Sequence, residues 1–247
     1  MKYLKVLIWP IMFMVGEFFI QYIFVAYFNN KYYSNTDLYS IINTIEYQNK
    51  LNNFINNHTL LIVLITSIIF IPLFYIIFKK YKTNIKLNIS IVIKYILLAI
   101  LISTAYNLYL SIIINYQISR LPIIVQIISS GIIGPIIEEL LFRGIIYNKL
   151  KEFNSTKKAM IISTIIFSIV HFNIIDIIYT VFIGYILVYI YEKYHTLKYP
   201  ILFHITANIS VILLSLIISY SIILNIILLT ICIIILITKY IRTVIKS

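Results

Sequence analysis

The sequence is poor in cysteine and in charge. Cys232 is the only cysteine among 247 residues, so the chain has no disulfide framework and no cysteine-based metal site. Charged residues make up 11% of the chain, whereas a soluble domain has about 25%. Hydrophobic residues make up 62%, and the mean hydropathy is +0.99. This composition excludes an ordinary soluble domain and indicates an integral membrane protein.

The apolar residues fall into runs of the length that predicts membrane-spanning helices. We therefore expect an all-α, polytopic membrane helical bundle of about eight transmembrane helices. The runs are 4–28, 59–78, 88–113, 121–148, 159–173, 174–191, 201–218 and 222–238. Residues 29–58 are polar and rich in asparagine and tyrosine. We interpret them as a loop with a short amphipathic helix around 38–47.

The net charge of +12 has a membrane explanation. The basic residues lie in the short links between apolar runs, where the positive-inside rule places them, so we expect no nucleic-acid partner. With both termini in the cytoplasm, fifteen lysines and arginines lie inside and three outside. This asymmetry predicts a multi-pass protein of the cell membrane. The abundance of Ile, Asn, Lys and Tyr, which AT-rich codons give, points to a bacterial plasma membrane.

The fourth run carries three ionisable side chains within six residues. Glu139 and Arg143 are four residues apart on the expected helix, so they share a face and can pair. Glu138 is turned about 100° away from Glu139 and is left free. Pro135 has no N–H, which leaves the Gly131 carbonyl without its α-helical partner. A structural salt bridge would explain Glu139 and Arg143, but it leaves the second carboxylate unexplained.

Two later runs add polar groups of catalytic type. His171 lies in the fifth run, and His204 and Asn208 lie four residues apart in the seventh. With Glu138 they supply a general base, imidazoles and a polarising donor, which is the set that adds water to a peptide carbonyl. Two histidines and a glutamate also ligate catalytic zinc in other proteins. The chain has no HExxH sequence, so the helical zinc motif of soluble zinc proteases is absent.

These motifs resemble the CAAX prenyl protease and bacteriocin-processing (CPBP) family of intramembrane proteases. They are Glu138-Glu139-x-x-x-Arg143, Phe167-x-x-x-His171 and His204-x-x-x-Asn208, in this order on successive runs. The family includes type II CAAX prenyl endopeptidases, lysostaphin-resistance proteins and bacteriocin self-immunity proteins. The resemblance implies a catalytic core at 121–212, preceded by membrane helices and a loop of unknown role at 1–120. Residues 213–247 would form a last helix and a basic tail.

The resemblance also implies roles for single residues. Glu138 would activate water, and His171 would act as a second base or as a water or metal ligand. His204 and Asn208 would stabilise the oxyanion. The supporting residues would be Glu139 and Arg143, which pair, and Phe167, which packs beside the site. The mechanism is open between a metal-free route and one divalent metal, such as zinc, held by Glu138, His171 and His204.

The expected activity is that of an intramembrane endopeptidase, a possible metalloendopeptidase, on membrane-associated proteins or peptides within the bilayer. The processing of CAAX proteins and a bacteriocin-related reaction are both open. The alternative is a non-enzymatic immunity or binding protein. A proton-coupled transporter is disfavoured, because the two halves of the chain show no matching Gly/Pro-broken helices. Glu17, the one carboxylate in the first run, is interpreted as a partner for a polar group in the bundle.

Straight helices do not bring the candidate residues together. At about 1.5 Å per residue, His171 lies roughly 20 Å from the cytoplasmic end of its run and His204 roughly 6 Å. Tilted helices, a kink at Pro135, or a run that starts deeper in the membrane would reconcile these depths. We expect the resulting site to open toward the cytoplasm.

Overall fold

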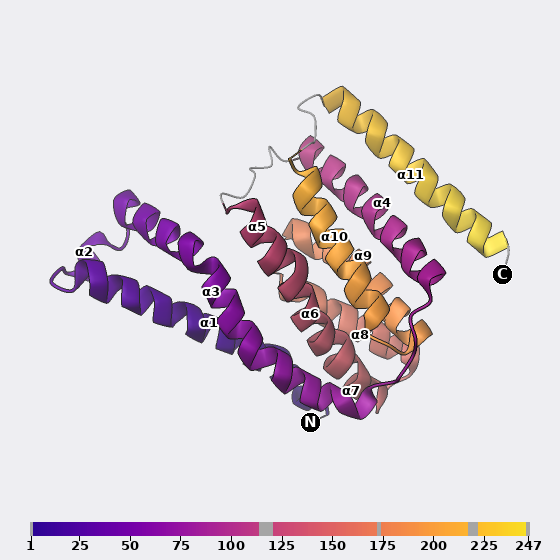
Figure 1. Cartoon of the computed structure of the whole chain (residues 1–247), viewed down its shortest axis with the longest axis horizontal. Helices are drawn as coiled ribbons and strands as arrows, with labels where there is room; N and C mark the ends of the chain where they lie inside the picture. The colour runs from indigo at the N-terminus through magenta and orange to yellow at the C-terminus, as the bar shows by residue number, and fades with distance from the viewer. Residues whose placement is uncertain (1, 114–120, 172–173, 217–221, 246–247) are drawn as a thin grey trace.

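The computed structural model describes residues 2–113, 121–171, 174–216 and 222–245 and shows a helical bundle without β-strands in these ranges (Figure 1). Each expected apolar run forms a helix or part of one. The elements are α1 (Lys2–Tyr33), α2 (Leu38–Ile41), α3 (Ile45–Phe78), η1 (Lys79–Tyr81), α4 (Ile89–Ile113), α5 (Ile123–Gln126), η2 (Ile127–Ile133), α6 (Gly134–Glu139), η3 (Leu140–Tyr147), α7 (Asn148–Lys151), α8 (Thr156–Ile169), α9 (Ile174–Tyr194), α10 (Lys198–Leu214) and α11 (Ile222–Ile245).

The expected membrane bundle is confirmed, whereas the count of eight spans is not. Within the described ranges, five helical stretches are long and apolar enough to cross a membrane: 2–33, 45–81, 89–111, 123–151 and 176–194. Helices α8 and α10 have 14 and 17 residues. At 1.5 Å per residue even the longer one measures about 26 Å, which is shorter than a hydrocarbon core of about 30 Å. The protein is therefore a multi-pass membrane protein in which α8 and α10 are shorter than a full span.

The predicted loop at 29–58 is shorter than expected, because it spans only 34–44; the short helix expected there is present as α2. Helix α1 continues to Tyr33 and α3 begins at Ile45, so the two form a long antiparallel pair, which we call the α1–α3 hairpin. The apolar residues of this stretch recur at helical spacing between asparagines, and they pack on α1. The small core comprises Phe28, Tyr47 and Phe54 with partly buried neighbours that include Leu51 and Ile55. The Thr44 hydroxyl caps α3 by accepting a hydrogen bond from the Tyr47 N–H.

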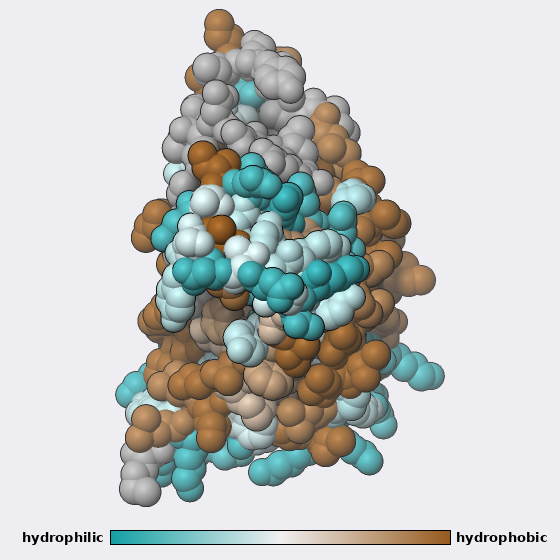
Figure 2. Space-filling view, turned by 90° about the vertical axis from the view of Figure 1, so that its left-hand side faces the viewer, coloured by the Kyte–Doolittle hydropathy of each residue, from teal (hydrophilic) through white to brown (hydrophobic). Residues whose placement is uncertain are grey.

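The hairpin diverges from the rest of the bundle. In Figure 1 its tip, at α2, lies on the left, well away from α4 and α11, whereas its other end packs beside α7. Figure 2 faces this tip and shows polar residues over it, with apolar residues below and a second polar fringe at the lower edge. A polar tip on two apolar helices is the pattern of a membrane hairpin whose turn reaches an aqueous interface.

The lysines expected in the cytoplasm gather at one end of the bundle, which we call the lysine-rich end. Lys2, Lys5 and Lys149 surround one small pocket with Glu152. The Lys198 ammonium donates a hydrogen bond to the Ile85 carbonyl across two further links of the chain. Links that are distant in the sequence therefore meet on one side, as the predicted orientation requires.

The stretch from Ile123 to Lys151 is one continuous helix, which we call the central helix. It contacts α3, α8, α9 and α10, so it lies at the centre of the packing. Its middle, α6, holds both site carboxylates and is flanked by two π-helical segments, η2 and η3. π-Helical turns within α-helices are frequent at functional sites, because the wider turn redirects side chains and backbone groups.

Candidate active site

A buried ion pair forms the base of the site. Arg143 Nη1 donates to Glu139 Oε1 at 2.8 Å, and the two side chains are 1% and 0% exposed. The i,i+4 pairing predicted from the sequence is therefore present. The second terminal nitrogen of Arg143 donates to the Gly184 carbonyl on α9 at 3.0 Å. His204 Nδ1 lies 2.9 Å from the same Glu139 oxygen, so the pair is part of the site and not a separate structural salt bridge.

Phe167 packs beneath this network. The Arg143 guanidinium lies 4.3 Å from the centre of the phenyl ring, a cation–π geometry. The ring also contacts His171 and His204, with centroid distances of 5.0 and 6.0 Å. Gly184 permits this packing, because a Cβ atom there would lie 2.8 Å from Phe167 Cδ1. Phe167 thus separates the two histidines at fixed distances.

The hydrogen bonds determine which imidazole nitrogen carries a proton. The Phe167 carbonyl can only accept, so His171 Nδ1, at 2.9 Å, carries the hydrogen and Nε2 keeps its lone pair. Glu139 is charged because it pairs with Arg143, so His204 Nδ1–H donates to it as well. A carboxylate that accepts from one ring nitrogen fixes the orientation of the ring. His204 Nε2 is therefore directed toward the reactive side of the site.

Glu138 is the free carboxylate of the site. Its Oε2 lies 3.8 Å from His204 Nε2, and the side chain is 27% exposed. Among the described residues this Oε2 is buried and has no hydrogen-bond partner. A buried carboxylate oxygen without a donor is costly unless water or a substrate meets it. Glu138 and His204 thus face each other across a gap wide enough for a bridging proton or water contact.

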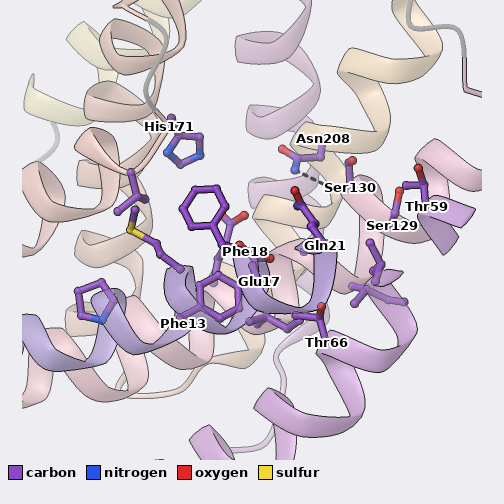
Figure 3. Close-up of a pocket in the computed structure, with 18 of the residues that line it drawn as sticks. Phe13, Glu17, Phe18, Gln21, Thr59, Thr66, Ser129, Ser130, His171 and Asn208 are labelled. Atoms are coloured by element: carbon purple, nitrogen blue, oxygen red, sulfur yellow. Dashed lines mark hydrogen bonds between the residues drawn. The ribbon is translucent and has the colours of Figure 1, made fainter. Parts of the chain in front are cut away.

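Asn208 compensates for Pro135. The N–H of Gly134 bonds to the Ser129 carbonyl five residues earlier, in the π register. In the π register the N–H of residue 135 would bond to the carbonyl of residue 130, whereas in an α-helix it would bond to that of residue 131. Because Pro135 has no N–H, the Ser130 carbonyl is the one left without a helical partner. Asn208 Nδ2 donates to the Ser130 carbonyl at 2.8 Å (Figure 3). The prediction of an unpaired Gly131 carbonyl was therefore one residue off, because the helix is wider there.

A cavity of about 390 Å³ lies over the site residues, between the α1–α3 hairpin and the rest of the bundle. Figure 3 shows Gln21, Ser129, Ser130 and Asn208 on one side of it and His171 on the other. Glu138, His171 and Asn208 all line the cavity, as does Glu17 from α1. Sequence reasoning gave Glu17 no part in the site. The signal was present, because Glu17 is the only Asp, Glu, Lys, Arg or His residue of α1 between Lys5 and Lys31.

The polar part of the cavity lies away from the lysine-rich end. Gln21 is 19 residues after Lys2, or about 29 Å along α1, and Thr59 is 22 residues before Tyr81, or about 33 Å along α3. The hydrocarbon core is about 30 Å thick, so these cavity residues lie toward the opposite face. This differs from the expected opening toward the cytoplasm. The cause is the long hairpin, which contributes polar residues from its outer half.

The expected metal set is not assembled as a ligand group. Across the described ranges, no cluster of three or more His, Cys, Asp or Glu residues has a metal-binding arrangement. His204 Nδ1 is committed to Glu139, and His171 meets the site through the ring of Phe167. We therefore derive no step through a metal. The roles given to the site residues stay predictions.

Comparison with known proteins places this site in a family. Residues 120–210 match the family model described as type II CAAX prenyl endopeptidase, Rce1-like. The chain is also similar to a Bacillus subtilis (strain 168) protein named "Putative membrane peptidase YdiL", with 34% identity over 91 residues. Residues 120–210 are thus similar to the Rce1-like family, over less than half of the chain. The predicted resemblance to intramembrane CAAX-type proteases is thus confirmed for this segment.

The Rce1-like segment is a minor part of the molecule. The aligned region covers 37% of this chain and 37% of the Bacillus relative. No solved structure matches the chain. The segment includes Glu138, His171, His204 and Asn208, whereas Glu17 and the α1–α3 hairpin lie outside it. One wall of the cavity is therefore built from residues that the family match does not cover.

Proposed function

We propose that this protein is an intramembrane endopeptidase that hydrolyses peptide bonds of membrane-associated proteins or peptides. The observation that carries the proposal is the free Glu138 carboxylate in a cavity, facing His204 Nε2, with His204 held by a buried Glu139–Arg143 pair. The Rce1-like family and the peptidase name of the Bacillus relative favour the same reaction class. The composition and this relative favour a bacterial plasma membrane.

In the proposed reaction, Glu138 accepts a proton from a water molecule as the water oxygen attacks the peptide carbonyl carbon. The carbonyl electron pair moves to oxygen and forms a tetrahedral oxyanion. The second Nδ2 hydrogen of Asn208, and His204 protonated on Nε2, are donors for this oxyanion. His171 Nε2 accepts a hydrogen bond from the attacking water. Glu138 then transfers its proton to the leaving nitrogen as the C–N bond breaks, which restores the carboxylate.

The identity of the substrate and of any cofactor is proposed separately from the reaction class. CAAX-type processing and the cleavage of a bacteriocin-related peptide both use this chemistry. A single divalent metal such as zinc stays a prediction from the residue types at Glu138, His171 and His204, and chelation of the purified protein tests it. The reaction written above predicts cleavage that survives a chelator. Activity that is lost on chelation and restored by zinc would favour the metal route.

The first experiment compares peptide termini in cells that express either the unmutated chain or Glu138→Gln at matched levels. The glutamine is nearly isosteric and removes only the base, so new termini should occur with the unmutated chain alone. Glu46→Gln, which removes an exposed carboxylate far from the cavity, is the matched control and should cleave normally. Equal peptide sets together with a cellular function retained in Glu138→Gln would refute the protease and favour a binding or immunity protein.

A further inference from the structure

Glu17 is held at the cavity by close helix packing. The preceding residue, Gly16, faces Phe70 on α3, and a Cβ atom at Gly16 would lie 2.4 Å from the ring. Helices α1 and α3 therefore touch at this level, and the adjacent Glu17 is directed into the cavity that Glu138 also lines. Figure 3 shows Glu17 on the α1 wall, across the cavity from His171.

Glu17 has no partner of its own. Among the described residues, no hydrogen bond or ion pair joins its carboxylate. The nearest charge with which it interacts is that of Glu138, which has the same sign. A carboxylate inside an apolar span costs several kcal/mol unless it meets a partner. The packing thus maintains a costly group that the proposed hydrolysis, based on Glu138, does not use.

The charged side chains on the described wall of the cavity are all acidic. Among the described residues that line it are two carboxylates, Glu17 and Glu138, and no lysine or arginine. Arg143 lies nearby, but its terminal nitrogens bond to Glu139 and to the Gly184 carbonyl. In a medium of low dielectric constant, two like charges attract a cation and repel an anion more strongly than they would in water. The cavity is therefore suited to a cationic ligand.

This charge discriminates between kinds of peptide. Removal of a carboxy-terminal tripeptide places the free terminal carboxylate three residues from the cleaved bond, at most about 10 Å away at 3.3 Å per residue. That carboxylate would enter a cavity whose described lining has two glutamates and no lysine or arginine. A lysine or arginine at the same distance would instead supply the counter-charge that Glu17 lacks.

We propose that Glu17 is a specificity-determining residue, and that the cavity takes internal segments of cationic peptides in preference to free carboxy-terminal tripeptides. The proposal deepens the protease function and rests on it. Glu17 contacts the ammonium or guanidinium group of a basic substrate residue within about three positions of the cleaved bond, while Glu138 acts on water. The preferred substrate is thus a cationic, membrane-associated peptide chain that is cut in its interior.

The test uses the purified full-length protein in lipid nanodiscs and a pooled library of apolar peptides with acetylated and amidated ends. Mass spectrometry counts the cleaved bonds, with lysine or glutamine placed at each position within three residues. We expect lysine to favour cleavage about tenfold over glutamine in the unmutated protein. Glu17→Gln should reduce that ratio to about one while still cutting the neutral peptides. Glu17→Asp should retain most of the ratio, and Glu46→Gln should not change it.

A second pool with free carboxyl ends tests the other half of the proposal. Bonds three residues from the end should be cut about tenfold less than in the amidated pool, and Glu17→Gln should narrow the difference. Cleavage without a lysine preference, or a preference that survives Glu17→Gln, would overturn the role of Glu17 and leave the protease intact. No cleavage of either pool, or equal cleavage by Glu138→Gln, would instead overturn the protease function and this proposal with it.

Discussion

The buried pair of Glu139 and Arg143 allows stability and catalysis to be separated. Arg143→Met leaves a carboxylate that is 0% exposed without its cation, and Glu139→Leu leaves a guanidinium that is 1% exposed without its anion. Removing one partner of a buried ion pair typically costs about 3–5 kcal/mol. We therefore expect each single substitution to lower the free energy of unfolding by about that amount.

The double substitution should behave differently. With Glu139→Leu and Arg143→Met together, no charge is left unpaired, and apolar replacements of a buried pair are often tolerated. Two smaller losses remain, because His204 Nδ1 and the Gly184 carbonyl no longer have their partners, and each unsatisfied buried group costs about 1–3 kcal/mol. The double variant should therefore be more stable than the sum of the single effects predicts, and it should still be inactive because His204 is no longer oriented.

The measurement is the free energy of unfolding in mixed micelles on titration with a denaturing detergent, together with peptide cleavage by the same preparations. The exposed pair Glu46 and Lys50, with side chains 77% and 57% exposed, is the matched control. Its double replacement should leave unfolding and cleavage unchanged. If the Glu139–Arg143 double variant regained cleavage along with its stability, the pair would be only structural. Single variants as stable as the unmutated chain would contradict the burial itself.

Three further results are expected. Asn208→Ala should lower the free energy of unfolding by about 0.5–1.5 kcal/mol, because the hydrogen bond to the Ser130 carbonyl is exposed. Pro135→Ala in the same chain should restore most of it, since the new N–H can bond to the carbonyl that Asn208 served; no rescue would refute the π-register argument. Gly184→Ala should cost about 1–3 kcal/mol by overpacking against a phenyl ring, measured by the same titration. In a cysteine-free background, Thr59→Cys should react with an impermeant maleimide added to intact cells, whereas Lys149→Cys should not; the reverse pattern would contradict the orientation.

Local spacing was enough to predict the helices and the most buried contact of the site. The Glu139–Arg143 pair follows from four-residue spacing on one helix, and the structure shows it at 2.8 Å. Hydropathy was likewise sufficient for the five long spans, because twenty-residue apolar runs have few alternatives in a membrane, but not for the count of eight. These features depend on neighbours in the sequence, so they could be read without knowledge of the fold.

The features that were missed depend on partners elsewhere in the chain. Residues 45–58 look polar in sequence, and their helix is stabilised by apolar side chains that pack on α1. The carbonyl left unpaired by Pro135 is that of Ser130 and not of Gly131, because η2 is wider than an α-helix, and no propensity scale predicts this wider turn. Glu17 lines the cavity because the neighbouring Gly16 packs against Phe70 of α3. Each of these outcomes required the approach of a second helix.

The division of the cavity between two parts of the chain separates the proposed chemistry from the proposed selection. Glu138, proposed to move the proton, and His204, proposed to stabilise the oxyanion, lie in the Rce1-like segment. The geometry of the two depends on contacts with Arg143 and Phe167 in that same segment. The opposite wall comes from the α1–α3 hairpin, outside the segment that the family model matches. Similarity within residues 120–210 therefore supports a shared reaction without supporting a shared substrate. A change of charge or length in the hairpin would change what enters the cavity while the catalytic groups keep their positions.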